Sequence, residues 1–116
     1  MCSGTPHTDL RAALSWSYRA LQDDAATMFR KLGLHPASDI GVEAAAALGD
    51  LPVAQVKALL DQLVAAHLVE QRRPNQYQLH DLIRLYATEA ARRNASDADR
   101  ATAVRRVLDW YLKAAV

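Results

Sequence analysis

The chain has 116 residues, of which 51% are hydrophobic and 23% charged, so it can bury a core as one domain without disulfides or metals. Its single cysteine, Cys2, allows no disulfide framework, and a formal net charge of +1 gives no global electrostatic reason to bind nucleic acid. The sequence has no apolar run of the roughly 18 residues that a membrane span needs and no secretory signal, so we expect a cytoplasmic protein with no membrane partner.

The N-terminal part of the chain predicts two helices. Apolar side chains recur with helical spacing over residues 9–21, after a leader at residues 1–8 that we expect to be flexible or left from cloning. Asp23 and Asp24 can cap a second helix, and Gly33 is expected to end it in a left-handed conformation.

The next segment predicts a helix-turn-helix. Ser38 or Asp39 can open a short, Ala-rich helix that ends at Gly49, and Pro52 fits the first turn of the helix that follows. This following helix has a broad apolar stripe made of Val53, Val56, Leu59, Leu60, Leu63 and Val64.

Residues 68–79 predict two strands joined by a turn at residues 73–75. A helix-turn-helix followed by a hairpin is the order of elements in a winged helix. The sequence therefore predicts a mainly α fold with a small β-hairpin wing, in which residues 9–93 form the winged-helix domain and helices flank it at both ends.

Two more helices are expected after the hairpin, one over residues 81–93 and one capped by Asp97. The buried stripe of the last helix is expected to consist of Val104, Val107, Leu108, Tyr111 and Leu112. Because the amphipathic pattern continues to the end of the sequence, we expect residues 94–116 to lead toward a following domain that is absent here, and the chain to be a piece of a longer protein.

The sequence contains no recognisable catalytic or metal-binding motif. No Gly-rich loop carries Lys and Ser or Thr, so the chain cannot build a P-loop. His7, His35, His67 and His80 lack metal-ligand spacing. We therefore expect that the chain is not an enzyme by itself.

Local charge argues against DNA binding by the helix-turn-helix. Residues 39–67 contain four acidic residues and one basic residue, Lys57, a formal charge of −3 that would repel phosphates. If the domain does bind DNA as a winged-helix transcription factor, the contacts would come from Gln55 and Lys57 in the second helix and from Arg72 and Arg73 in the wing. A third alternative is a structural or dimerising module that associates through exposed apolar side chains, for which Trp16 and Trp110 are the candidates.

The most informative stretch is residues 78–87, where strand spacing changes to helical spacing at His80 and Asp81. Asp81 can accept a hydrogen bond from the free amides of the first helical turn. His80 then either packs in the core beside a capped helix or projects from the fold as a functional group.

Three blocks of sequence resemble a known family. They are residues 17–21 (Ser-Tyr-Arg-Ala-Leu), residues 28–36 (Met-Phe-Arg-Lys-Leu-Gly-Leu-His-Pro) and residues 79–87 (Leu-His-Asp-Leu-Ile-Arg-Leu-Tyr-Ala). Together they resemble the winged-helix subdomain of NB-ARC (STAND) signalling ATPases. The Ala-rich helices are most similar to actinobacterial AfsR-like transcriptional activators of the SARP class.

This resemblance implies a role for the chain and for two of its residues. His80 would belong to the Met-His-Asp motif and hydrogen-bond the β-phosphate of ADP held by a neighbouring nucleotide-binding domain, and Asp81 would cap its helix and support the loop. Leu79 replaces the Met of that motif. The resemblance implies no cofactor for the chain alone, ADP or ATP shared with an adjacent domain of the same polypeptide, and a repeat domain downstream.

Overall fold

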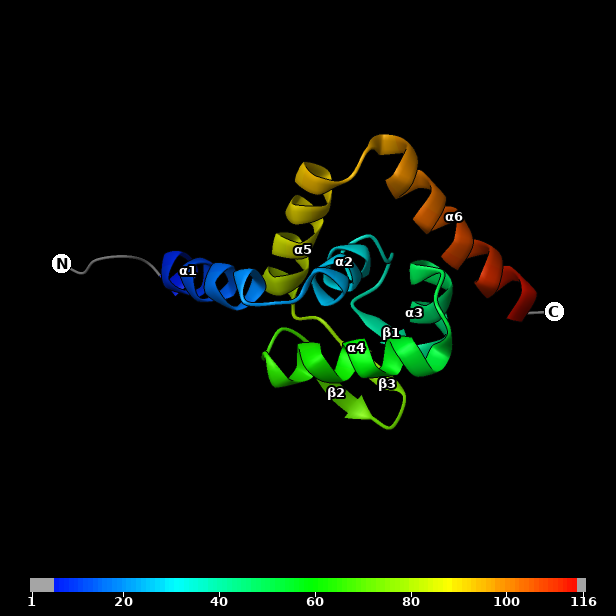
Figure 1. Ribbon diagram of the computed structural model, residues 1–116, viewed down its shortest axis with the longest axis horizontal. Helices are drawn as coiled ribbons and strands as arrows, with labels where there is room; N and C mark the ends of the chain where they lie inside the picture. Colours follow the sequence, from blue (N-terminus) through cyan, green and yellow to red (C-terminus); the bar gives the residue numbers. More distant parts are fainter. Residues whose placement is uncertain (1–5, 115–116) are drawn as a thin grey trace.

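The computed structural model describes residues 6–114, with side chains from residue 11 onward. Its helices are α1 (Pro6–Arg19), α2 (Asp23–Leu32), α3 (Val42–Gly49), α4 (Val53–Ala65), α5 (Asp81–Asn94) and α6 (Asp97–Ala114). Its strands are β1 (Asp39–Gly41), β2 (Glu70–Arg73) and β3 (Gln76–Gln78). In Figure 1, α2 lies near the centre, α5 and α6 form an arch above it, and α3, α4 and the strands lie below.

The order α2, β1, α3, α4, β2, β3 forms a winged helix, and the predicted fold class is confirmed. The wing is a three-stranded antiparallel sheet in the order β1-β3-β2, so β3 is the central strand. The turn between β2 and β3 contains Asn75 at a φ of 67°, in the left-handed region that Asn tolerates.

One prediction in this region is wrong: residues 39–41 form β1, and the Ala-rich helix begins only at Val42. Asp39 pairs with Gln78, and Ile40 pairs with the buried Tyr77. The strand exists because β3 offers it hydrogen-bonding partners from a distant part of the sequence.

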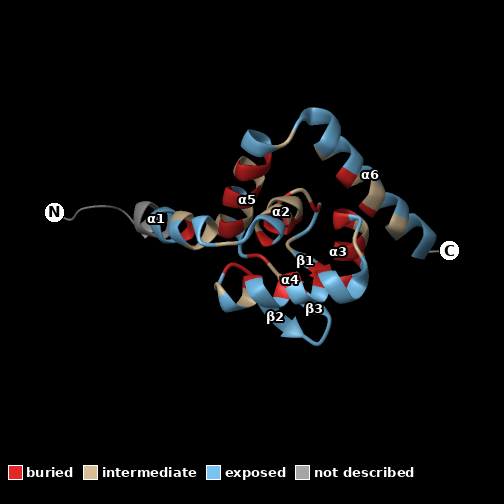
Figure 2. Cartoon of the chain, in the orientation of Figure 1, coloured by how far each residue is buried: buried red, intermediate tan, exposed pale blue. Residues whose placement is uncertain are grey.

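The core forms where α2, α3, α4 and α5 face one another, as the buried positions in Figure 2 show. Phe29 of α2 is fully buried, with the ring centroids of Tyr18 and Tyr86 at 5.7 and 6.4 Å. The predicted stripe of α4 is confirmed at Val56, Leu59, Leu60 and Leu63, while Val53 is 45% exposed and Val64 is half-buried.

Gly33 follows the last residue of α2, but glycine is needed there for a different reason from the one predicted. Its φ of −65° is right-handed, so the predicted left-handed stop is wrong. Instead, α2 and α5 cross so closely there that a Cβ on Gly33 would lie 2.6 Å from the backbone of Ala87 and Thr88. Glycine is therefore required by the close approach of the two helices.

The N-terminal ends of three helices also differ from the expectations. Helix α1 begins at Pro6, so residues 6–8 of the expected leader are helical; residues 1–5 lie outside the described part of the chain. Gln22 holds the N-cap position of α2, where Asp24 accepts a hydrogen bond from the amide of Ala25 at 2.8 Å. At α6 the hydroxyl of Ser96, not the predicted Asp97, accepts a hydrogen bond from the Asp99 amide at 3.1 Å.

The buried side of α6 is narrower than predicted. Ala103 and Val107 are buried where α6 packs on α3, and Trp110 is partly buried against the same core. Leu108, Tyr111 and Leu112 are 46%, 37% and 68% exposed, so the prediction that they are buried is wrong. Leu108 and Leu112 line a groove together with residues of α5.

Candidate functional site

His80 lies at the junction between β3 and α5, and its side chain projects from the fold. The residue takes the N-cap position of α5 with an extended backbone, at φ −66° and ψ 155°. Its side chain is 62% exposed, whereas Leu79 before it is 2% exposed. Because Leu79 anchors the backbone in the core, His80 is held firmly and yet does not pack in the core itself.

Asp81 does not cap α5 as predicted. It is the first helical residue, while His80 holds the N-cap position and makes no side-chain hydrogen bond to the first turn of α5. Its negative charge in the first turn is favourable for the helix dipole, so its contribution is electrostatic. The missing side-chain cap leaves the first-turn amides of α5 beside an exposed imidazole.

The surroundings of His80 form a shallow pocket of about 430 Å³. His67, Glu70 and Ile83 also line this pocket. Nε2 of His80 lies 3.2 Å from the Glu70 carboxylate, which is itself 45% exposed, so the contact is at the surface. A surface pair of this kind contributes little to stability, and a competing ligand could replace it.

The residues named for DNA contact lie on two exposed elements. Gln55 and Lys57 are exposed on α4, and Arg72 and Arg73 are exposed on β2. Arg72 donates a hydrogen bond to the Gln78 side chain at 2.8 Å, within the wing. The structure therefore leaves all four side chains at the surface, but they share that region with the acidic residues that the charge count identified.

The two tryptophans differ in exposure. Trp16 is 77% exposed on α1, whereas Trp110 packs partly against the core and edge-on to Tyr111. Trp110 is therefore not available as an exposed apolar contact, and Trp16 alone fits the dimerisation alternative.

His35 is a buried polar residue whose role the sequence analysis missed. It is 2% exposed; Nδ1 lies 2.7 Å from the carbonyl of Ala37, and Nε2 lies 2.6 Å from the hydroxyl of Tyr111. Burial lowers the pKa of His35 below its ordinary value of 6.5, and the charge of Arg84 lowers it further, while the hydrogen bond with Ala37 opposes these effects. The neutral ring thus joins the loop after α2 to α6.

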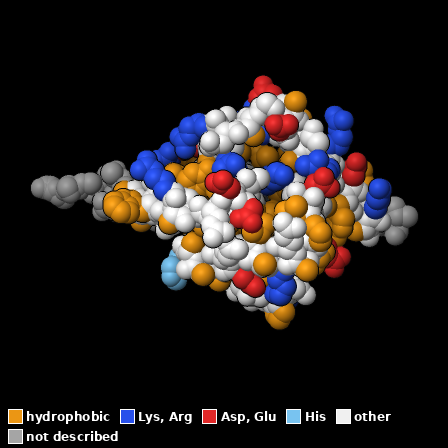
Figure 3. All heavy atoms as spheres, in the orientation of Figure 1, with side chains coloured by type: hydrophobic (Ala, Val, Ile, Leu, Met, Phe, Trp, Pro, Cys, Tyr) orange, Lys and Arg blue, Asp and Glu red, His pale blue; other side chains and the backbone are white. Residues whose placement is uncertain are grey.

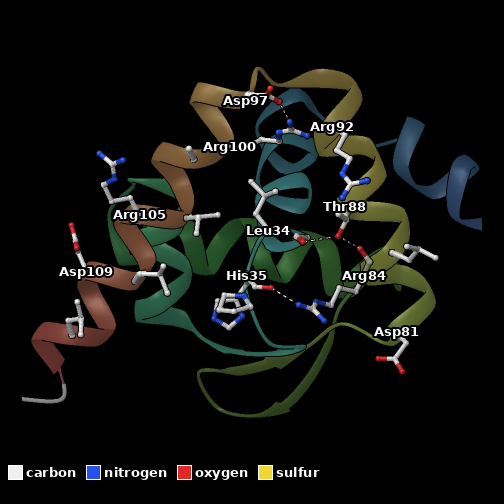
Figure 4. Close-up of a pocket in the computed structure, with 17 residues that line it drawn as sticks. Leu34, His35, Asp81, Arg84, Thr88, Arg92, Asp97, Arg100, Arg105 and Asp109 are labelled. Atoms are coloured by element: carbon white, nitrogen blue, oxygen red, sulfur yellow. Dashed lines mark hydrogen bonds and ion pairs between the residues drawn. The ribbon is translucent and has the colours of Figure 1, made fainter.

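A long groove lies between α5 and α6 on the face shown in Figure 4. Its volume is about 1240 Å³, and its lining includes the exposed leucines Leu85, Leu108 and Leu112. Arg84 crosses its floor and donates a hydrogen bond to the His35 carbonyl at 2.8 Å. The exposed apolar side chains of α6 therefore line this groove.

Within residues 11–114, no group of three or more His, Cys, Asp or Glu side chains is placed to hold a metal ion. No helix in the described part of the chain is long and apolar enough to cross a membrane.

The described residues thus form a winged helix with a surface histidine at the start of α5. The chain is similar to curated proteins that include Regulatory protein AfsR of Streptomyces coelicolor, 40% identical over 110 residues, and Regulatory protein AfsR of Streptomyces griseus, 41% identical over 107 residues. Each alignment covers 91% of this chain but 11% of the relative, so the chain spans about 11% of the length of these relatives. No family model matches the chain.

The likeness to AfsR-like regulators that the sequence predicted is therefore confirmed over most of the chain. The finer assignment, to the winged-helix subdomain of an NB-ARC ATPase, stays a prediction.

Proposed function

We propose that this chain is a non-catalytic winged-helix module of a longer, nucleotide-switched transcriptional regulator. In this role, His80 donates a hydrogen bond to the β-phosphate of ADP bound by an adjacent nucleotide-binding domain. The module then relays the nucleotide state to other parts of the regulator, inside the cytoplasm. The similarity to AfsR proteins supports a regulatory role, and the resemblance of residues 79–87 to the Met-His-Asp motif supports the ligand.

The observation that carries the proposal is the exposure of His80 on a rigidly anchored backbone. Its imidazole and the uncapped amides of α5 are both hydrogen-bond donors, and the helix dipole adds positive potential at this end. An anion is the ligand that such a group of donors suits. In this structure Nε2 of His80 lies beside the Glu70 carboxylate. A phosphate from a second domain would take the place of that carboxylate.

A pair of measurements on His80→Ala tests the proposal. Because the side chain is exposed and its contact with Glu70 lies at the surface, the free energy of unfolding of the variant chain should lie within about 0.5 kcal/mol of the wild-type value. In the longer regulator the same change should weaken ADP retention by about 1.5 to 3 kcal/mol, the scale of a hydrogen bond to a charged group. It should also raise basal activity, because ADP would favour the closed state less.

His67→Ala is the matched control, because His67 is exposed and lines the same pocket. It should leave ADP release unchanged in the longer regulator. A destabilised His80→Ala chain together with normal ADP release would refute the assignment of His80.

DNA binding is the second candidate function, and the exposure of Gln55, Lys57, Arg72 and Arg73 on α4 and the wing is the observation in its favour. The formal charge of −3 over residues 39–67 opposes it. We expect the isolated chain to bind duplex DNA no more tightly than a non-specific ligand, at about 10⁻⁴ to 10⁻⁶ M in physiological salt. Sub-micromolar, sequence-selective binding in a salt titration would establish this second function instead.

A further inference from the structure

A third cavity, smaller than the two already described, lies where α2, the end of α5 and the first half of α6 meet. Its volume is about 290 Å³, and it shares Leu34 and Arg100 with the long groove. Ala91 and Asn94 place it at the C-terminal end of α5, the opposite end from His80. The cavity is therefore separate from the site of the proposed ADP contact.

Positive charge dominates this cavity. Arg30, Lys31, Arg100 and Arg106 line it, and Asp99 is the one carboxylate among the lining residues. Arg100 forms an ion pair with Asp97, which lies outside the cavity. Figure 3 shows several Lys and Arg side chains on the face over α2, between α5 and α6, with Asp and Glu side chains among them.

The other three cations have no carboxylate partner among the described residues. Arg30 donates hydrogen bonds to the hydroxyls of Tyr18, at 2.8 Å, and Thr27, at 3.1 Å. Lys31 lies 3.4 Å from the carbonyl oxygen of Gly49. Nε of Arg106 is buried and has no hydrogen-bond partner within the described part of the chain. All the hydrogen-bond acceptors of these three side chains are neutral, and none of the three forms an ion pair within the described part of the chain.

Burial and the neighbouring guanidinium groups both disfavour the charged form of Lys31. Burial lowers the pKa of Lys31, and repulsion by Arg106 and Arg30 lowers it further, against the opposing attraction of Asp50 and Asp99. A solvated arginine face would not have this property, because exposed side chains spread apart and are screened by water and salt. A buried donor without a partner is also rare in folded proteins.

We propose that this cavity binds a small phosphate-class anion, with Arg30 and Lys31 of α2 and Arg106 of α6 as its ligands. A multiply charged oxyanion has enough acceptor oxygens for two guanidinium groups and one ammonium group, and arginine suits phosphate because its planar donors bind two oxygens together. The anion is either free phosphate or pyrophosphate, or the phosphate group of a nucleotide. Because the cavity is walled by three helices, it admits a small anion rather than the backbone of a duplex.

Binding would join α2 to α6. The ligands come from two helices, so the anion would neutralise the repulsion between them and stabilise the docked position of α6. A ligand that binds only the folded chain raises its stability in proportion to the logarithm of ligand concentration.

The test is a set of thermal melts and calorimetric titrations of the chain with pyrophosphate, phosphate and ADP, in sodium chloride of matched ionic strength. We expect the melting temperature to rise with at least one of the phosphate ligands and not with the chloride control. Binding of ADP no tighter than pyrophosphate would assign the phosphates alone as the ligand, and tighter binding of ADP would assign a nucleotide; both results support the site.

Arg106→Gln should weaken the binding about tenfold, the effect of losing one hydrogen bond between charged groups. Arg105→Gln is the matched control, since it removes the same charge from the preceding residue of α6, which is exposed and lines the long groove instead. Lys31→Gln tests the site from α2, in case Arg106→Gln disturbs α6. His80→Ala should leave the binding unchanged, which separates this site from the proposed ADP contact.

Two results would overturn the proposal. One is a melting temperature that responds to the phosphate ligands no more than to chloride. The other is an equal loss of binding in Arg105→Gln and Arg106→Gln, which would show that net charge, and not the cavity, attracts the anion.

Discussion

The crossing of α2 and α5 at Gly33 allows a sharp test of the packing. Gly33 has right-handed helical dihedral angles, so alanine there introduces no backbone strain. Its Cβ would nevertheless lie 2.6 Å from the carbonyl carbon of Ala87 and from the amide nitrogen of Thr88. Both are backbone atoms that no change of rotamer can move, so the two helices would have to separate.

The expected cost follows from opposing effects. Replacing glycine by alanine stabilises a chain by about 0.4 to 1 kcal/mol through the unfolded state when the site is compatible. Here the helices must move apart by roughly 1 Å to restore ordinary carbon contacts, and over-packing of this kind costs about 1 to 3 kcal/mol. The move also stretches the hydrogen bond from the Thr88 hydroxyl to the Gly33 carbonyl, now 2.8 Å long, which is worth about 1 kcal/mol. We expect Gly33→Ala to destabilise the chain by about 2 kcal/mol.

Urea unfolding of the chain measures this cost, with Gly49→Ala as the matched control. A Cβ on Gly49 would meet the flexible Met28 side chain first, with the sulfur at 3.3 Å, so that variant should stay within about 1 kcal/mol of the wild type. The close crossing of α2 and α5 would be refuted if Gly33→Ala had the same free energy of unfolding as the wild type and the same slope of that free energy against urea concentration.

Two further predictions concern the core. Leu60→Ala and Leu63→Ala should each cost about 2 to 5 kcal/mol in denaturant unfolding, because both side chains are fully buried, whereas Val53→Ala on the exposed end of the same helix should cost under about 1 kcal/mol. The pKa of His35 is below 6.5 in the folded chain, so below about that pH the unfolded chain binds more protons than the folded chain. The free energy of unfolding should therefore fall as the pH decreases below about 6.5. It should level off once the pH is below the pKa of His35 in the folded chain. His35→Gln should remove that part of the pH dependence, and an unchanged slope in the variant would show that another group causes it.

The sequence predicted the elements whose pattern is local. Helix α4 has apolar side chains at helical spacing after Pro52, and the hairpin has a turn at residues 73–75 between two short polar strands. These signals lie within a few residues of the structure they produce. The order of helix-turn-helix and hairpin was therefore sufficient to predict the winged helix.

Features that depend on distant partners were not predictable in this way. β1 has three residues and exists through pairing with β3, more than 30 residues further along the chain. The buried role of His35 was missed, because its partner Tyr111 follows 76 residues later. Periodicity showed that α6 is amphipathic. It could not show that α3 covers only a narrow strip of α6, or that Leu108 and Leu112 face a groove.

The candidate site was predicted in part. The change from strand to helical spacing located His80 at a junction, and the structure places it there with its side chain exposed. Which residue would occupy the N-cap was not predictable, because His80 and Asp81 are adjacent and the boundary of a helix is uncertain by a residue or two. The cavity proposed to bind an anion was missed because Arg30 and Lys31 of α2 and Arg106 of α6 are distant in the sequence and come together only through the packing of the helices.

The packing of α5 makes it the element through which a contact at His80 would act. Ala87, Ala90 and Ala91 are buried along its length, and the small side chains bring α5 close to α2 at Gly33. A displacement of the N-terminal end of α5 therefore cannot be absorbed by rearranging long side chains at that crossing, and α2 must move with it. Because α2 also contributes two of the three proposed anion ligands, the two proposed sites lie at opposite ends of one rigid pair of helices. A ligand shifts a conformational equilibrium only through its different affinity for the two states. An anion that binds between α2 and α6 would therefore oppose any nucleotide-bound conformation of the regulator in which α6 separates from α2.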